Sequence, residues 1–220
     1  GHAQSGQFFG QIGAGRVVYQ DLVKINMAVE DGSLAENETL KNAYTYAKTN
    51  GKKIHLLGLV SDGGVHSHTS HLRGLIDATQ DFGLQKVFVH AFTDGRDVDP
   101  KSGGTYIQDL ENYIAKTSVK IASIVGRYYA MDRDKRWERI KKAYDLLVHG
   151  KGLLFSDAIE AVRDSYNSGV TDEFILPIGI NDETGKLCTQ AGANMLISGN
   201  YIFTGNYKER INNLKKSTVA

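Results

Sequence analysis

Residues 53–64 read Lys53-Ile-His-Leu-Leu-Gly-Leu-Val-Ser-Asp-Gly-Gly64, and this stretch decides the fold. Its first seven residues form a short apolar run, which is typical of a strand buried on both faces. Residues 60–64 then predict a turn, and residues 68–82 follow with a helical pattern. A strand, a polar loop and a helix in this order favour a parallel sheet covered by helices.

The same unit recurs along the chain. Apolar runs at residues 87–92, 120–125 and 174–180 predict further strands, and the first two of them end in polar loops. Helical patterns occupy residues 17–29, 37–49, 106–115, 137–148 and 157–166. We therefore expect one α/β domain over residues 1–220, with a largely parallel sheet of about four to six strands and helices on both faces. Ligands of such sheets bind beyond the carboxyl ends of the strands.

The charge balance excludes several classes of partner. The chain has 26 Lys and Arg against 25 Asp and Glu, a net charge of +1, so no global field attracts nucleic acid or membranes. No apolar run approaches the ~20 residues that a membrane-spanning helix needs. The single cysteine, Cys188, cannot form an internal disulfide. We therefore expect a cytoplasmic protein that binds neither nucleic acid nor membranes.

The first strand-end loop carries three histidines, His66, His68 and His71. One interpretation is a metal site, because neutral imidazole is a common metal ligand, although no His-Glu-x-x-His pattern is present. A second is a helix start, at which these side chains cap the backbone and contact water. A third is anion binding by a histidine beside backbone N–H groups exposed by the neighbouring glycines.

The second loop places Arg96 between carboxylates, in the order Asp94-Gly95-Arg96-Asp97. A surface ion pair is one interpretation, and such pairs are only weakly stabilising. The alternative is that the planar guanidinium of Arg96 binds a carboxylate or phosphate through two hydrogen bonds. A neighbouring aspartate could then hold the proton of a substrate hydroxyl.

The third segment, residues 126–139, contains four arginines within thirteen residues. Pairs such as Asp132 with Arg136 predict a solvated helix, and we expect this for Arg136 and Arg139. Arg127 differs because it directly follows a predicted strand and therefore lies at the carboxyl end of that strand. The interleaved acidic residues argue against base stacking by the aromatic residues of this segment. Spacing and composition thus predict an α/β domain that binds a small anion through arginine and histidine at the strand ends.

Five segments of the chain resemble one protein family. They are residues 12–20, 59–68, 90–97, 126–139 and 164–174, in the order and spacing that the family shows. The family is the cofactor-independent phosphoglycerate mutases, and the resemblance covers about residues 12–186.

The resemblance implies an activity and a set of site residues. The family interconverts 3-phosphoglycerate and 2-phosphoglycerate, with a serine in a separate metal domain carrying the phosphoryl group and two divalent ions, usually manganese, assisting. By resemblance, the substrate contacts are His66, Arg96, Asp97, Arg127 and Arg133. Asp97 is also the catalytic residue that this resemblance implies, since it matches the group that moves the substrate's hydroxyl proton.

Both ends of the chain depart from the family pattern. Ser5 falls at the position of the nucleophilic serine, but the residues around it differ, and the metal-binding segments are absent. Residues 187–220 also diverge, and they resemble the last strand, loop and helix of a phosphosugar epimerase barrel. These departures indicate a chimera, an engineered domain or a diverged relative.

The sequence therefore predicts a substrate-binding domain that binds phosphoglycerate and holds no metal or cofactor of its own. We expect no turnover without its partner, the metal domain of the full-length enzyme. One alternative is a structural or engineered scaffold in which the old site is a relic. Another, which rests on residues 187–220 alone, is an epimerase-type barrel of seven or eight strands.

Overall fold

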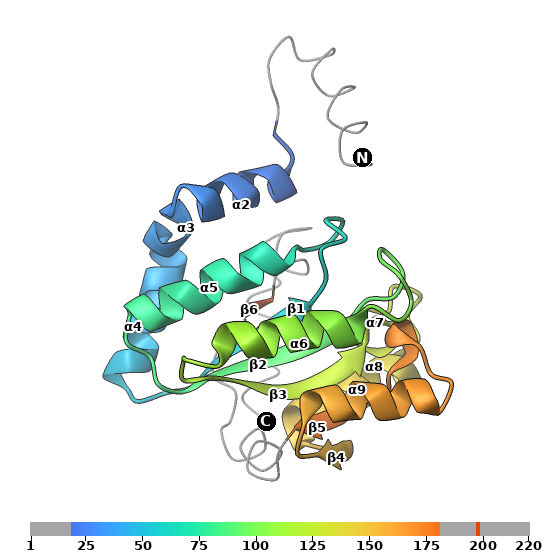
Figure 1. Cartoon of the computed structure of the whole chain (residues 1–220). Helices are drawn as coiled ribbons and strands as arrows, with labels where there is room; N and C mark the ends of the chain where they lie inside the picture. The colour runs from blue at the N-terminus through green and yellow to red at the C-terminus, as the bar shows by residue number, and fades with distance from the viewer. Residues whose placement is uncertain (1–18, 181–196, 199–220) are drawn as a thin grey trace, which may run out of the picture.

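The structure is a computed structural model that describes residues 19–180 and 197–198 (Figure 1). Ser5, Cys188 and most of the predicted divergent tail lie outside these described residues. Within them, a six-stranded sheet has the order β4-β5-β3-β2-β1-β6. The strands are β1 (Ile54–Leu59), β2 (Val87–Thr93), β3 (Val119–Gly126), β4 (Leu153–Phe155), β5 (Ile178–Ile180) and β6 (Ile197–Ser198).

The sheet is largely parallel, as predicted. Strand β1 pairs in parallel with β2 and β6, and β2 pairs in parallel with β3. Strand β5 runs antiparallel to β3, and β4 is parallel to β5. Because β4 and β6 are the two outer strands of the described sheet, the sheet is open, unlike the closed barrel of the epimerase alternative.

Helices cover both faces of the sheet, which confirms the predicted α/β class. They are α2 (Asp21–Glu30), α3 (Ser33–Glu36), α4 (Glu38–Thr49), α5 (Thr69–Asp81), α6 (Gly103–Ile114), α7 (Arg127–Ala130), α8 (Trp137–His149) and α9 (Ala158–Asn167). A large apolar core joins one face to α4, α5, α6 and α9, and α5 and α6 lie across that face in Figure 1. A smaller core joins Val125 of β3 to Ala143 and Leu146 of α8.

Side-chain caps explain where several predicted helices begin. The Asn37 carboxamide oxygen accepts hydrogen bonds from the amides of Thr39 and Leu40 at the start of α4, at 3.0 and 3.2 Å. The Asp157 carboxylate accepts one from the Glu160 amide, 2.7 Å away, at the start of α9. Short polar side chains in front of an apolar pattern thus locate these boundaries from sequence.

The prediction for residues 174–180 is wrong in its first half. Residues Asp172–Phe174 form a 3₁₀ helix, η1, and only Ile178–Ile180 form a strand. The amide of Gly126 donates to the Ile175 carbonyl, 2.8 Å away, so this segment is bonded to the end of β3 before β5 begins. The short elements α3, α7 and β4 were also not predicted, since each has four residues or fewer.

Three polar residues, which we call the histidine cluster, cross the middle of the sheet: His55 on β1, His90 on β2 and Ser123 on β3. His55 Nδ1 lies 2.9 Å from His90 Nε2, and His90 Nδ1 lies 2.7 Å from Ser123 Oγ. The register between β2 and β3 shifts after Val89, so that His90 faces Ser123 instead of Ala122. All three cluster residues are buried.

No helix within residues 19–180 combines the length and the apolar character needed to cross a bilayer.

Candidate functional site

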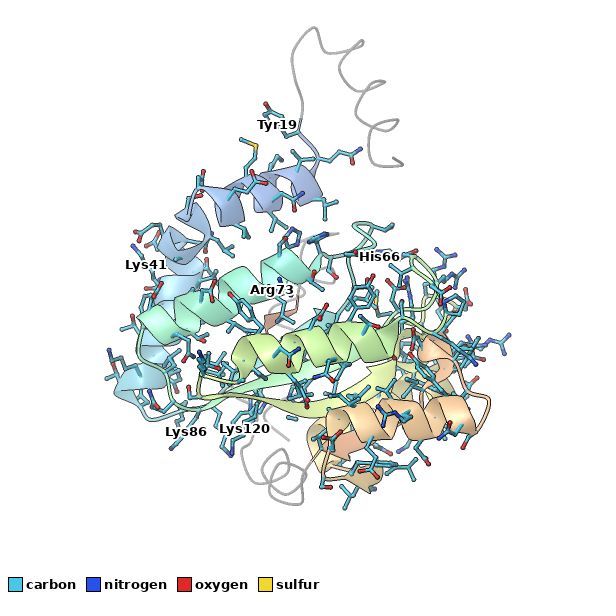
Figure 2. The ribbon with its side chains drawn as sticks, in the orientation of Figure 1. Tyr19, Lys41, His66, Arg73, Lys86 and Lys120 are labelled. Carbon is cyan, nitrogen blue, oxygen red and sulfur yellow. The ribbon has the colours of Figure 1, made fainter. Side chains whose placement is uncertain are left out.

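The loops after β1, β2 and β3 meet at the carboxyl end of the sheet, where the parallel arrangement predicts a site. Ser61 follows β1, Asp94 follows β2, and Arg127 follows β3. These three residues and Asp97 form what we call the strand-end cluster. Figure 2 shows His66 at this end, whereas Lys86 and Lys120 mark the opposite end of the sheet.

Asp94 lies at the centre of the strand-end cluster. Its Oδ2 accepts a hydrogen bond from Ser61 Oγ, at 2.7 Å. Its Oδ1 accepts from Arg127 Nη1, at 2.5 Å, and from the amides of Arg96 and Asp97, at 3.2 and 3.1 Å. Burial alone would raise the pKa of Asp94, but the bonds from Ser61, the Asp97 amide and Arg127 outweigh it and lower the pKa. The carboxylate is therefore ionised and fully bonded.

Arg127 is a buried cation between two carboxylates. Its Nη1 donates to Asp94 Oδ1 and, at 2.6 Å, to Asp97 Oδ2. Burial by itself would lower the pKa of Arg127, but the bonds to Asp97 and Asp94 hold it above its usual value. The residue is only 8% exposed, so a ligand would reach a cation that is already fixed in place.

Asp97 joins Arg127 to His66. Asp97 Oδ2 lies 3.9 Å from His66 Nε2, and the Asp97 side chain is 18% exposed. A Cβ atom on Gly63 would lie 2.9 Å from the Asp97 Cβ, so the first loop can approach the second this closely only because Gly63 lacks one. The site thus pairs a partly accessible carboxylate with an exposed imidazole.

The segment 172–175 forms the wall of the site beside Arg96. Arg96 Nη1 lies 3.5 Å from Glu173 Oε1. The neighbouring Asp172 is fully buried and accepts hydrogen bonds from the Gly103 amide, at 2.8 Å, and from the Tyr166 hydroxyl. Its backbone carbonyl accepts from Thr93 Oγ1, at 2.7 Å. Asp172 therefore ties the end of β2 to the start of α6.

Three glycines make room for this wall. A Cβ atom on Gly126 would lie 2.3 Å from the Glu173 carbonyl oxygen. On Gly95 it would lie 2.8 Å from the Asp172 Cβ, and on Gly103 2.5 Å from Asp172 Oδ1. These separations are shorter than real Cβ contacts, so the segment can dock here only against glycine.

The five residues predicted to contact substrate are brought together in part. His66, Asp97 and Arg127 form one connected group. Arg96 lies on the same turn, but its guanidinium is exposed and faces Glu173. Arg133 is exposed, and within the described residues no hydrogen bond or ion pair joins it to the other four. The substrate role of all five stays a prediction.

The expectation of a solvated Arg139 is wrong. Its guanidinium lies over the Tyr128 ring, 3.9 Å from the ring centroid, and 3.3 Å from Asp132 Oδ1. The Asp132 carboxylate bonds the backbone amide of Arg136, at 2.8 Å, in place of the predicted side-chain pair. Asp132 and Arg139 thereby brace the loop after α7.

The three histidines of the first loop have different roles. His68 caps α5, because its Nδ1 accepts from the Ser70 amide at 3.1 Å, so the helix-start interpretation is confirmed for this residue. His71 Nε2 lies 2.5 Å from Asn26 Oδ1 on α2. No group of three His, Cys, Asp or Glu side chains within the described residues could hold a metal ion.

Sequence reasoning missed the importance of Asp94 and Ser61. Both were visible as the first polar residues after predicted strands, which is the position from which parallel strands point into a site. The sequence pattern points to Arg96, which lies between Asp94 and Asp97, but Asp94 accepts four hydrogen bonds whereas the Arg96 side chain is 56% exposed.

A comparison with protein families identifies the chain. A family profile described as "BPG-independent PGAM N-terminus (iPGM_N)" matches residues 25–214. The chain belongs to this family. The match confirms the resemblance seen in the sequence and extends into the segment that we predicted to diverge.

Similar proteins of known name support the assignment of this chain to the iPGM_N family. A Flavobacterium johnsoniae protein named 2,3-bisphosphoglycerate-independent phosphoglycerate mutase is 63% identical over 191 residues, which cover 86% of this chain and 38% of that protein. A Clostridium kluyveri protein of the same name is 50% identical over 191 residues, with coverages of 86% and 38%. The chain thus spans well under half the length of these relatives.

A solved structure shares the fold of this iPGM_N chain. The crystal structure of Leishmania mexicana phosphoglycerate mutase at low cobalt concentration matches with a TM-score of 0.72 and 31% identity. The match covers 78% of this chain and 33% of that one.

Proposed function

We propose that this chain is the phosphoglycerate-binding part of a cofactor-independent phosphoglycerate mutase. The observation that carries the proposal is the buried Arg127, which forms ion pairs with two carboxylates at the carboxyl end of β3. A pre-positioned guanidinium in a low-dielectric site binds carboxylate or phosphate through charge-assisted hydrogen bonds. The names of the relatives supply the anion, a phosphoglycerate.

Each site residue has a separate task in this proposal. Arg127 binds one anionic group of phosphoglycerate, while Arg96 and Arg133, both exposed, bind the other as the ligand enters. Asp97 accepts the proton of the glycerate hydroxyl as that oxygen takes up the phosphoryl group, and it returns the proton in the reverse step. His66 lies 3.9 Å from Asp97 and orients the same hydroxyl.

The whole protein would interconvert 3-phosphoglycerate and 2-phosphoglycerate as a glycolytic isomerase in the cytoplasm. The described residues do not offer the donor set for the family's manganese ions, so we assign those ions and the phosphoryl-carrying serine to a metal domain outside this chain. In this chain, binding and orientation of the glycerate are the whole task. We therefore infer that the chain alone has no mutase activity.

Isothermal titration calorimetry with 3-phosphoglycerate tests the proposal. We expect wild type to bind at millimolar concentration or better, and Arg127→Lys to bind about 10-fold more weakly, because lysine keeps the charge but loses the planar fork. Arg163→Ala, which removes an exposed arginine from α9, is the matched control and should bind like wild type. Equal affinity of wild type and Arg127→Lys would contradict the proposal.

One observation favours the second candidate, a scaffold with a relic site. Arg127 and Arg96 are both ion-paired with carboxylates of the chain itself. If the site is a relic, the same titration will show no heat for wild type at millimolar phosphoglycerate, and inorganic phosphate will be equally silent.

A further inference from the structure

The two carboxylates on Arg127 differ in how firmly they are held. The Asp94 side chain is 2% exposed, and the Asp97 side chain is 18% exposed. Both contact the same atom, Arg127 Nη1, at 2.5 and 2.6 Å. They are therefore not equivalent counter-ions, although each contributes one negative charge.

Asp94 is locked by bonds that no ligand could replace. Two of its four donors are backbone amides, those of Arg96 and Asp97, and a third is the buried hydroxyl of Ser61. Within the described part of the chain, Asp97 accepts one side-chain hydrogen bond, from Arg127, and has one more distant charged neighbour, His66. A ligand anion can displace Asp97 from Arg127, but displacement of Asp94 would leave two amides and a hydroxyl without an acceptor.

The bonds of Asp94 also define the turn that carries the other site residues. Because its Oδ1 accepts from the amides of residues 96 and 97, the carboxylate fixes the backbone from which Arg96 and Asp97 project. The same oxygen fixes the guanidinium of Arg127 from the next strand. One buried oxygen therefore sets the relative positions of three predicted ligand contacts.

We propose that Asp94 is a positioning residue, which holds Arg127 and the turn of Arg96 and Asp97 in the geometry that binds the anionic substrate. Ser61 supports this role by bonding the second oxygen of Asp94. The inference rests on the proposed function, because the ligand is the phosphoglycerate of that proposal. Asp97, in contrast, is the exchangeable counter-ion that the incoming anion replaces.

The direction in which anion affinity changes when the Asp94 carboxylate is removed distinguishes a positioning role from a purely electrostatic one. Removing a negative charge beside an anion site should tighten anion binding if Asp94 acts only through its charge. If Asp94 acts by positioning, its loss should weaken binding. Asp94→Asn and Asp94→Ala remove the same charge, but asparagine keeps the shape and one acceptor oxygen, whereas alanine keeps neither.

The experiment is calorimetric titration of wild type, Asp94→Asn and Asp94→Ala with 3-phosphoglycerate. We expect Asp94→Ala to bind at least about 10-fold more weakly than wild type, with Asp94→Asn between the two. Binding by Asp94→Ala as tight as wild type, or tighter, would overturn the proposal. If Asp94→Ala does not fold, Ser61→Ala takes its place, with an expected loss of about 3-fold, and unchanged affinity would count against the proposal.

A ligand-free measurement keeps this inference apart from the proposed function. In ¹⁵N-edited NMR of the free chain, the Arg127 Nη–H signals of wild type should be resolved, because two carboxylates restrict rotation of the guanidinium. These signals should average in Asp94→Asn or Ser61→Ala if Asp94 positions Arg127, and stay resolved if it does not. If wild type binds no phosphoglycerate but its resolved Arg127 signals still average in the variants, the proposed function is refuted and the positioning role of Asp94 is retained.

Discussion

The strand-end cluster and the histidine cluster both draw their polar residues from β1, β2 and β3 or from the residues that directly follow these strands. At the strand ends these are Ser61, Asp94, Asp97 and Arg127, and the buried pair of Asp94 and Arg127 is ionised. In the middle of the sheet they are His55, His90 and Ser123. Burial, with the charge of Lys53, lowers the pKa of His55 to about 4, and burial beside His55 lowers that of His90 to about 3.

The difference teaches what each position in a parallel sheet allows. At the strand ends, loop amides and an opposite charge are available, so ions can be kept in a buried place. In the middle of a strand the backbone groups already bond the neighbouring strands, so the buried side chains there are neutral and bond one another. Among the described residues, only His55 Nε2 in this cluster has no hydrogen-bond partner. Of these two clusters, only the one at the strand ends, where a ligand can arrive, holds ionised groups.

The largest effect should come from breaking the strand-end cluster. Arg127→Ala leaves Asp94 as a buried carboxylate without its cation, so we expect the free energy of unfolding to fall by about 3–5 kcal/mol. Urea unfolding at pH 7 measures the loss. The double variant Arg127→Ala with Asp94→Asn should regain part of it, because no unpaired charge remains. A double variant that loses the sum of both single losses would refute this account.

Acid should break the histidine cluster first. His55 and His90 are neutral in the fold because their pKa values lie below the usual 6.5, so their contribution is complete above that pH. It is lost as the pH falls from 6.5 toward 4, by on the order of 3 kcal/mol for His55. Asp94 has a lowered pKa, so its own contribution disappears only below 3.8.

Urea unfolding at a series of pH values measures this acid loss. His55→Gln removes one titrating group and should flatten the loss between pH 6.5 and 4. His149→Gln, which changes an exposed histidine at the end of α8, is the control and should follow wild type. A flat stability profile for wild type over this range would contradict the prediction.

Replacing a glycine by alanine at the strand end should lower the stability more than the same replacement in the body of the sheet. A Cβ atom on Gly126 would lie 2.3 Å from the Glu173 carbonyl oxygen, whereas no atom of the described residues lies within 4 Å of one on Gly58 in β1. We expect Gly126→Ala to lose about 1–3 kcal/mol of stability. Gly58→Ala should stay close to wild type, and the two melting temperatures make the comparison. Equal melting temperatures would contradict this prediction, because they would mean that residues 172–175 shift to accommodate the added Cβ atom at little cost in stability.

The smallest effect should come from the partly exposed ion pair between Arg96 and Glu173. Arg96 is 56% exposed on its side chain and lies 3.5 Å from Glu173. Exposed pairs contribute little, so Glu173→Gln should change the free energy of unfolding by less than about 0.5 kcal/mol. A loss similar to that of Arg127→Ala in the same urea assay would mean that Arg96 is held as firmly as Arg127.

Much of the fold and part of the site could be predicted from sequence. The strands at 54–59, 87–93 and 119–126 are apolar runs that end at turn residues, and the carboxyl-end rule brings His66, Asp97 and Arg127 together. The histidine cluster could not be predicted, because it depends on the register shift after Val89. The position of Arg139 over Tyr128 depends on tertiary packing that no local pattern encodes.

The docking of Asp172 onto Thr93 has a consequence for the order in which the chain is made. The two residues are 79 positions apart, and the wall that Asp172 anchors completes the loops after β2 and β3. At a synthesis rate of roughly 5–20 residues per second, the ribosome needs about 4–16 s to travel from one to the other. Asp94 would stand without the wall for almost all of that interval, and Arg127 from its own synthesis onward, so the binding site is among the last parts of the domain that translation can complete.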